Sequence, residues 1–118
     1  MNILALRNLR EVIFGQTLNS NDELCISVIS EFEFYCGCLD SQRRSEAEEF
    51  FQLFSRIDFD SQHCIAASKI YINLHSKNQL LDVMDILLAG VAGQEEMVVA
   101  TLNKAHFERI EDLEILSL

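Results

Sequence analysis

The sequence predicts an α/β protein in which a short parallel sheet carries helices on both faces. Segments with helical and with strand patterns alternate along the 118 residues, as they do in folds of this class. The strands predicted at 24–29 and 97–101 are apolar at most positions, which indicates that both faces of each strand are buried beneath other elements. The helix predicted at 82–93 is apolar nearly all round and therefore belongs between the sheet and other helices.

The other elements are predicted from apolar spacing, capping residues and turn residues. Ser30 and Glu33 fit the two halves of a capping box, Gly37 fits a helix end, and Asp60 fits the cap of a long helix. The apolar stripe of that long helix consists of Cys64, Ala67, Ile70, Tyr71 and Leu74. The predicted ranges are an apolar segment at 3–14 that ends at Gly15, a polar turn at 17–22, helices at 30–36, 41–54 and 60–76, and strands at 56–59 and 113–116.

Length and composition limit the class of protein. A chain of 118 residues is expected to form one domain, here residues 1–118. No apolar run approaches the roughly 18 to 20 residues that a membrane span needs, and residues 1–9 lack the pattern of a secretory signal, so we expect a cytoplasmic protein. The net charge of −10 argues against broad electrostatic binding to nucleic acid and would attract a basic partner segment. We expect reduced, mostly buried thiols at the four cysteines, Cys25, Cys36, Cys38 and Cys64.

Three oxygen-bearing side chains come at the ends of predicted strands or at the start of a helix. Glu33 lies just past the strand at 24–29, Asn103 just past the strand at 97–101, and Asp85 in the first turn of the apolar helix. Ligand sites in a parallel sheet form at the carboxyl ends of the strands, where groups from distant parts of the chain converge. Because Mg²⁺ takes oxygen ligands and keeps several waters, the pattern is typical of a Mg²⁺ or Mn²⁺ site that acts on a phosphodiester.

Each of these residues also fits an ordinary structural role. Glu33 fits half of the capping box, and Asp82 and Asp85 fit first-turn acids favoured by the helix dipole. Asn103 fits a turn at a strand end, and His106 fits a packing or surface position. From the residues alone, both sets of interpretations stay open.

Three motifs, taken in order, resemble those of a known family. The first is ISVISEFE at 26–33, the second is DILLA at 85–89, and the third is VATLNKAHFERI at 99–110, followed by a short predicted strand. Together they resemble the PIN-domain nucleases, and among these the VapC-like toxins of toxin–antitoxin pairs. The resemblance covers roughly residues 24–118.

The resemblance implies a three-layer α/β/α sandwich and an endoribonuclease that depends on Mg²⁺ or Mn²⁺. It also implies an RNA substrate, a cognate antitoxin as partner, and a homodimer. Glu33 and Asp85 match the second and third acidic positions of the family and are the expected metal ligands. Asn103 matches the fourth position and completes the expected catalytic set. The residues expected beside the site are Asp82, Thr101 and His106.

The front of the chain departs from the family. Relatives begin with a strand that ends in an aspartate central to the metal site, whereas here Ala5 or Leu6 stands at that position. The segment aligns either as a degenerate strand or as a helix with the first strand absent, and its short spacing to Ser27 slightly favours the helix. A missing central strand would leave unpaired backbone groups, each costing about 1–3 kcal/mol if buried. Three explanations stay open: residues 2–6 form a degenerate central strand, a partner supplies the strand, or the natural chain begins upstream.

The missing carboxylate leads to two functional hypotheses. In the first, the chain is an endoribonuclease with weak metal binding and impaired cleavage. In the second, it is a catalytically inactive PIN-like module for binding or assembly. A surplus of aromatic residues also predicts a homodimer through the helices at 30–36 and 41–54. These aromatic residues are Phe32, Phe34, Tyr35, Phe50, Phe51 and Phe54.

Overall fold

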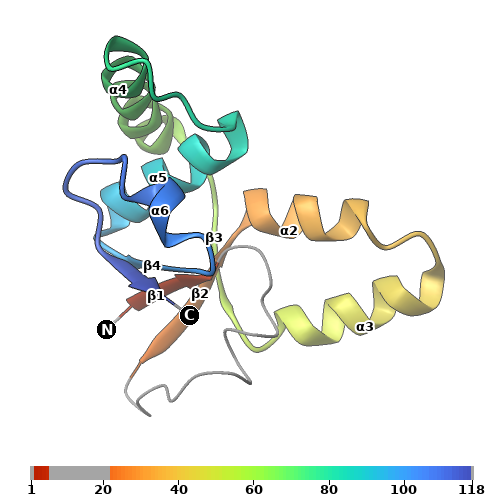
Figure 1. The fold of residues 1–118 in the computed structure, drawn as a ribbon. Coiled ribbons are helices and arrows are strands. Elements are labelled where there is room, and N and C mark those ends of the chain that lie inside the picture. Colours follow the sequence, from red (N-terminus) through yellow and green to blue (C-terminus); the bar gives the residue numbers. More distant parts are fainter. Residues whose placement is uncertain (1, 6–21, 118) are drawn as a thin grey trace.

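The sheet has five parallel strands in the part of the chain that the computed structural model describes, residues 2–5 and 22–117 (Figure 1). The strands lie in the order β3-β2-β1-β4-β5, and each pair of neighbours is parallel. This arrangement confirms the predicted fold class. The strands are β1 (Asn2–Ala5), β2 (Glu23–Ser27), β3 (Ser55–Ile57), β4 (Val98–Thr101) and β5 (Ile115–Ser117).

β1 is the central strand of the sheet. Its residues Ile3 to Ala5 are fully buried, and Ala5 pairs with Ile26 of β2 and with Ala100 of β4. The alignment of the N-terminal segment as a helix, which its spacing to Ser27 slightly favoured, is therefore wrong at residues 2–5, and residues 6–14 lie outside the described residues. The structure supports the first of the three explanations, a degenerate central strand formed by the chain itself. Apolar residues suit this place because both faces of a central strand are buried.

Helices cover both faces of the sheet and complete a three-layer α/β/α sandwich, as predicted. Along β1, Ile3 and Ala5 face one apolar cluster and Leu4 faces the other, as the alternation of a strand requires. The first cluster joins the sheet to α3 through Ala47 and Phe51, and the second joins it to α4 and α5. The helices are α2 (Val28–Cys36), α3 (Ser41–Phe51), α4 (Ser61–Ser76), α5 (Val83–Glu95) and α6 (Lys104–Phe107).

α2 contributes to both apolar clusters and, with α3, extends to one side of the sheet (Figure 1). Ile29 packs against the cluster of α4 and α5, whereas Phe34 and Tyr35 pack against the cluster of α3. The ring centroids of Phe34 and Tyr35 lie 5.2 Å and 5.3 Å from that of Phe51. Most of the aromatic residues are thus used within the fold, and Phe32 is the exposed exception at 61%. The surplus that predicted a homodimer through these helices is therefore not present.

The start of α2 differs from the prediction. The helix begins at Val28 because Ser27 caps it, with the Oγ atom of Ser27 accepting a hydrogen bond from the N–H of Ile29 at 3.1 Å. Ser30 lies within the helix and is 6% exposed. The predicted cap at Ser30, and its capping box with Glu33, are therefore wrong.

Most other element ends lie close to the predicted residues. Gly37 ends α2 and Asp60 caps α4, as predicted. α3 ends at Phe51 rather than at residue 54. The polar turn expected at 17–22 lies outside the described residues except for Asp22. Within the described ranges, no helix is long and apolar enough to cross a membrane.

The four cysteines are free thiols, but the expectation that most are buried is wrong. Cys25 is buried in β2, and burial raises the pKa of its thiol. Cys36 and Cys64 are exposed, and Cys38 is half-buried. On α4 the buried position next to Cys64 belongs to His63, which is 2% exposed.

Candidate functional site

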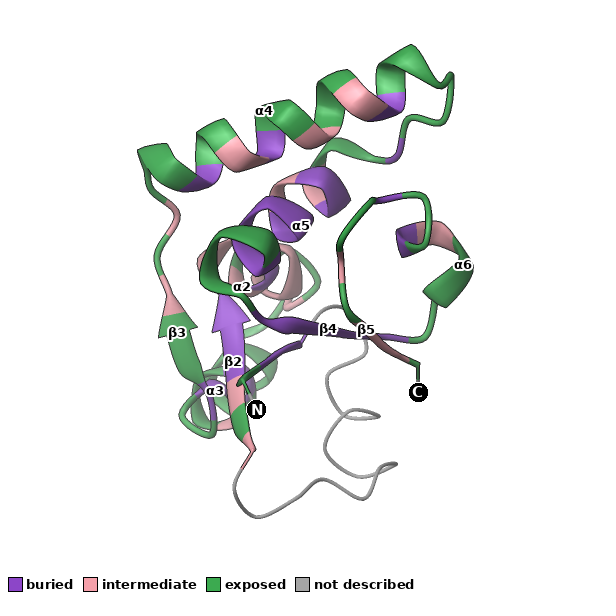
Figure 2. Cartoon of the chain, turned by 90° about the vertical axis from the view of Figure 1, so that its left-hand side faces the viewer, coloured by how far each residue is buried: buried purple, intermediate pink, exposed green. Residues whose placement is uncertain are grey.

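The carboxyl ends of β2, β1 and β4 meet at one edge of the sheet, which we call the carboxyl edge. Because Ala5 pairs with both Ile26 and Ala100, the next residues of the neighbouring strands, Ser27 and Thr101, flank the end of β1. Both are buried, with 0% and 5% exposure. Figure 2 shows the buried end of β2 running into α2.

Buried polar side chains gather at the carboxyl edge. Five polar or charged residues are buried in the described ranges, and four of them come at strand ends or first helical turns on this edge. These four are Ser27, Ser30, Asp85 and Thr101. Burial of a polar group costs free energy unless the group is hydrogen-bonded, so an edge that served packing alone would be expected to be apolar. The set marks the carboxyl edge as the candidate site.

Asp85 is the buried charged group of this site. It lies in the first turn of α5, is 4% exposed, and has its negative charge favoured by the helix dipole. The Nδ1 atom of His106 lies 3.7 Å from the Oδ2 atom of Asp85. His106 belongs to α6, which follows β4 in the chain. The fold therefore brings His106 beside Asp85, so that a protonated imidazole would form an ion pair with this carboxylate.

Glu33 lies on α2, which contacts α5. Its side chain is half-buried, and its Oε1 atom is screened from solvent. Glu33 and Asp85 thus lie on two helices that are in contact, close to where each helix leaves the carboxyl edge.

The remaining predicted site residues have identifiable local roles. Asp82 is exposed and caps α5, its Oδ1 atom accepting a hydrogen bond from the N–H of Met84 at 2.9 Å. The Oγ1 atom of Thr101 accepts a hydrogen bond from the N–H of Asn103 at 3.0 Å, so a threonine rather than an Asx turn shapes the end of β4. Asn103 is exposed, and its side chain makes no capping hydrogen bond to α6. Its amide is therefore not required to start that helix.

The described residues of the carboxyl edge do not complete the predicted metal centre. Among the described residues, no group of three or more histidine, cysteine, aspartate or glutamate side chains is placed to hold a metal ion. Two positions align with the family's first aspartate, Ala5 and Leu6. The side chain of Ala5 belongs to the apolar cluster of α3, on the face of the sheet opposite to the helix that carries Asp85. The other position, Leu6, lies outside the described residues. Two carboxylates and one amide supply few protein oxygen ligands for Mg²⁺, which favours near-octahedral oxygen coordination.

Among the residues that the structure describes, two cations near the carboxyl edge are paired with carboxylates. The Nε atom of Arg56 on β3 lies 3.3 Å from Oε1 of Glu31 on α2. The Nζ atom of Lys104 lies 3.7 Å from Oε1 of Glu108. Arg109 forms no ion pair with another described residue. Because they are paired, Arg56 and Lys104 add little net attraction for a phosphate backbone.

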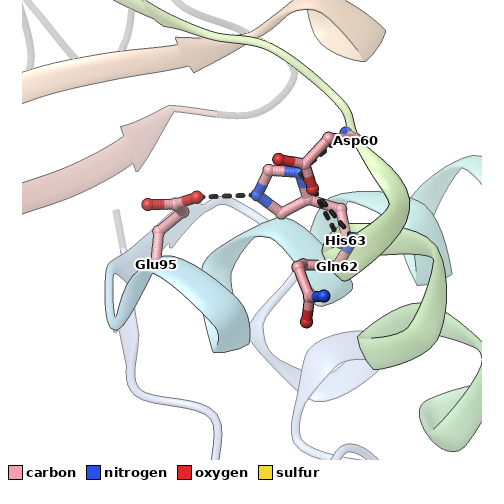
Figure 3. Close-up of polar contacts among 4 residues, drawn as sticks. All are labelled: Asp60, Gln62, His63 and Glu95. Carbon is pink, nitrogen blue, oxygen red and sulfur yellow. Dashed lines mark hydrogen bonds and ion pairs between the residues drawn. The ribbon is translucent and has the colours of Figure 1, made fainter.

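A second polar cluster lies at the far end of α5. The buried ring of His63 donates from Nε2 to Oε1 of Glu95 at 2.7 Å, and its Nδ1 atom accepts the N–H of Asp60 at 3.0 Å (Figure 3). Glu95 comes ten residues after Asp85 on the same helix, a separation of about 15 Å along the axis. The cluster is therefore remote from the carboxyl edge and holds α4 to α5.

Sequence reasoning missed the buried hydroxyl groups of Ser27 and Ser30. The sequence pattern that could have identified them is a small polar residue inside an apolar stretch where a strand changes into a helix. His63 was also missed, because its partner Glu95 is 32 residues away in the chain.

Comparison with known families decides the classification of the chain. Its sequence matches the PIN domain over residues 3–113. The chain belongs to the PIN domain family. The match begins within β1, so it extends further toward the N-terminus than the motifs at 26–110 do.

Two relatives of this PIN domain are nucleases by name. Ribonuclease VapC1 from Methanocaldococcus jannaschii is 32% identical over 87 residues, which cover 74% of this chain and 64% of the relative. The tRNA(fMet)-specific endonuclease VapC from Salmonella typhimurium is 29% identical over 117 residues, which cover 96% of this chain and 89% of the relative. The matched segment thus spans less than two thirds of the Methanocaldococcus protein.

The fold of this PIN domain is also that of solved complexes. A chain in the crystal structure of VapBC2 from Rickettsia felis, bound to a DNA fragment from the promoter, has a TM-score of 0.87 and 22% identity. The likeness covers 100% of this chain and 99% of that chain. At this identity it supports the fold alone.

Proposed function

We propose that this PIN domain is an endoribonuclease of the VapC type, the toxin of a toxin–antitoxin pair. The observation that carries the proposal is the PIN match over residues 3–113, together with two relatives named as ribonucleases. Residues 1–118 act as one domain in the cytoplasm, and the substrate is RNA. The reaction is hydrolysis of a phosphodiester bond at the carboxyl edge.

Glu33, Asp85 and Asn103 are the proposed catalytic residues. Glu33 and Asp85 would be the ligands of Mg²⁺ or Mn²⁺, and Asn103 would position a water molecule. His106 contacts Asp85 and would limit the freedom of that carboxylate. Because the described residues do not form a complete metal centre, we expect weak metal affinity and slow cleavage, and we derive no reaction step through the ion.

Cleavage of RNA by Glu33→Gln and Asp85→Asn variants tests the proposal. Both substitutions keep side-chain size and remove a charge, so Mg²⁺-dependent cleavage by the wild type should fall at least about tenfold in each. Glu48→Gln, an exposed acid on α3, is the matched control and should keep wild-type activity. Cleavage that survives both site substitutions would show that another site, or a contaminant, is responsible.

The alternative proposal is a catalytically inactive module for binding or assembly. It is favoured by the buried apolar residues of β1 and by the incomplete ligand set among the described residues. Calorimetric titration with Mn²⁺ separates the two proposals. Saturable binding in the micromolar range, lost in Asp85→Asn, supports the nuclease, whereas no binding below the millimolar range supports the inactive module.

A cognate antitoxin and a second copy of the chain are the proposed protein partners. The Rickettsia felis structure is a VapBC complex, and the net charge of −10 would attract a basic partner segment. We expect a homodimer by light scattering, and a monomer at high concentration would contradict it. Its interface needs a surface other than the packed aromatic residues of α2 and α3.

A further inference from the structure

Ser30 carries a buried hydroxyl group at the start of α2. The residue lies in the first turn of the helix and is 6% exposed. Its Oγ atom has no hydrogen-bond partner in the part of the chain that the structure describes. The hydroxyl groups of Ser27 and Thr101, at the same edge, are used, because they accept the N–H groups of Ile29 and Asn103. A buried hydroxyl without a partner lowers stability, and an alanine at position 30 would avoid this cost.

Glu33, a proposed catalytic residue, is well placed to accept a hydrogen bond from this hydroxyl. It follows Ser30 by three residues on α2, and side chains with this spacing lie on the same face of a helix, with Cβ atoms about 5–6 Å apart. Long side chains on a helix lean toward its N-terminus, which directs the carboxylate of Glu33 over the turn that contains Ser30. The Oγ atom of Ser30 and the Oε1 atom of Glu33 are both screened from solvent. The donor and the acceptor thus share one buried face of α2.

The same lean directs Glu33 toward the carboxyl edge. β2 ends at Ser27 and α2 begins at Val28, so the N-terminal turn of α2 is the part of the helix that lies at this edge. Asp85 occupies the first turn of α5, and α5 contacts α2. A hydrogen bond from Ser30 would hold the carboxylate of Glu33 at the end of α2 where the proposed site lies. Catalytic groups need such a fixed orientation, because a small misplacement costs much of the rate.

We propose that the hydroxyl of Ser30 donates a hydrogen bond to the carboxylate of Glu33 and so positions this carboxylate for the reaction. The inference rests on the proposed function and adds a positioning residue to its site. The bond forms by rotation about the side-chain bonds of Ser30 and Glu33, with no change in the backbone of α2. It differs from the capping box predicted from the sequence, in which backbone N–H groups are the donors.

The rival role for Ser30 is a hydrogen bond to the backbone of its own segment. A serine on a helix also bonds to the carbonyl group three or four residues earlier. Ser68 on α4 makes such a bond, with its Oγ atom 2.7 Å from the carbonyl oxygen of Ile65. A backbone contact of this kind would act in the same way whatever residue stands at position 33. The dependence on Glu33 therefore separates the two roles.

A double-mutant cycle in urea unfolding tests the proposal without any cleavage. Ser30→Ala should raise the equilibrium constant of unfolding about 5- to 30-fold in the wild type, but less than about twofold in Glu33→Met, which lacks the carboxylate. Ser68→Ala is the matched control, and its effect should be the same in both backgrounds. An equal effect of Ser30→Ala in both backgrounds would overturn the proposal. A lower unfolding constant in Ser30→Ala than in the wild type would also overturn it, because this is the result for a hydroxyl without a partner.

The variants Ser30→Thr and Ser30→Val isolate the hydroxyl group at nearly constant shape. Threonine keeps the donor, whereas valine replaces it with a methyl group. For RNA cleavage, kcat should be at least about tenfold higher in Ser30→Thr than in Ser30→Val, at similar KM, since a misplaced carboxylate slows the reaction without weakening substrate binding. Equal kcat values would refute the positioning role.

The outcomes also separate this inference from the proposed function. Coupling between Ser30 and Glu33 without any RNA cleavage by the wild type would support the hydrogen bond and count against the nuclease. Cleavage that depends on Glu33 but not on the hydroxyl of Ser30 would overturn the inference and leave the nuclease standing.

Discussion

Replacing His63 with alanine should destabilise the protein substantially, although His63 is remote from the proposed site. The ring is 2% exposed and bridges α4 and α5, with Glu95 at 2.7 Å and the N–H of Asp60 at 3.0 Å. Because Nδ1 accepts a backbone N–H, the neutral ring carries its proton on Nε2 and donates it to Glu95. Both ring nitrogens are thus used, and alanine removes both contacts at once.

The magnitude follows from what the ring contributes. Truncation of a large buried side chain to alanine costs about 2–5 kcal/mol, and loss of a helix cap or of one hydrogen bond costs about 1 kcal/mol each. Glu95 has a side chain that is 39% exposed, so water replaces much of its lost partner. The contributions overlap because one ring makes them all, and we therefore expect a loss of about 2–4 kcal/mol.

Urea unfolding followed by circular dichroism measures this loss. His75→Ala is the control on the same helix, where an exposed ring stacks on Tyr71 with centroids 6.0 Å apart, and it should cost less than about 1 kcal/mol. A double-mutant cycle with Glu95→Ala should give a coupling energy of about 0.5–1.5 kcal/mol. A His63→Ala variant within about 0.5 kcal/mol of the wild type, or a coupling of zero, would refute the reasoning.

Two further predictions concern the packing of α4 on α5 and the pKa of Glu111, which Lys77 lowers. Gly90→Ala would place a Cβ atom 2.8 Å from the Cβ atom of Ala67, so the free energy of unfolding should fall by about 1–3 kcal/mol. In the control Gly93→Ala the new Cβ atom meets nothing within 4 Å, so the free energy of unfolding should rise by up to about 1 kcal/mol. Equal effects of the two substitutions in thermal unfolding would contradict this prediction. The hydrogen bond from Lys77 lowers the pKa of Glu111, so the pair stabilises the fold above the ordinary glutamate pKa and this stabilisation is lost as the pH falls through the lowered value. In Lys77→Met the pKa of Glu111, followed by NMR, should rise toward 4.5, and an unchanged pKa would show that Lys77 is not its cause.

Much of the fold was predictable because it depends on local patterns. The apolar strand ending in Thr101, the cap at Asp60 and the stop at Gly37 each leave a signal within a few residues. The start of α2 was not predictable in the same way, because Ser27 and Ser30 both suit an N-cap and the choice between them depends on burial. For residues 2–5, a short apolar segment fits a helix or a strand equally well, and pairing with β2 and β4 decides the outcome.

The candidate site was predictable in part for the same reason. Its residues follow strand ends, which parallel topology brings to one edge, so Asp85 and His106 are adjacent as the motifs indicate. The role of Asp82 as an ordinary cap could not be separated from that of Asp85 by sequence, since both are acids at the start of one helix. Burial separates them, because Asp82 is exposed and Asp85 is 4% exposed.

The fold of this chain does not depend on a central carboxylate. β1 is held by backbone pairing on both sides and by the buried side chains of Ile3, Leu4 and Ala5. A further acid near Asp85 and Glu33 would bring like charges together in a partly buried place, which raises the free energy of the ionised form. Replacing such an acid with an apolar residue removes this cost while leaving the sheet intact. Under the proposed function, metal binding and stability make opposite demands at this edge, because a cluster of acids that holds a metal ion also destabilises the fold.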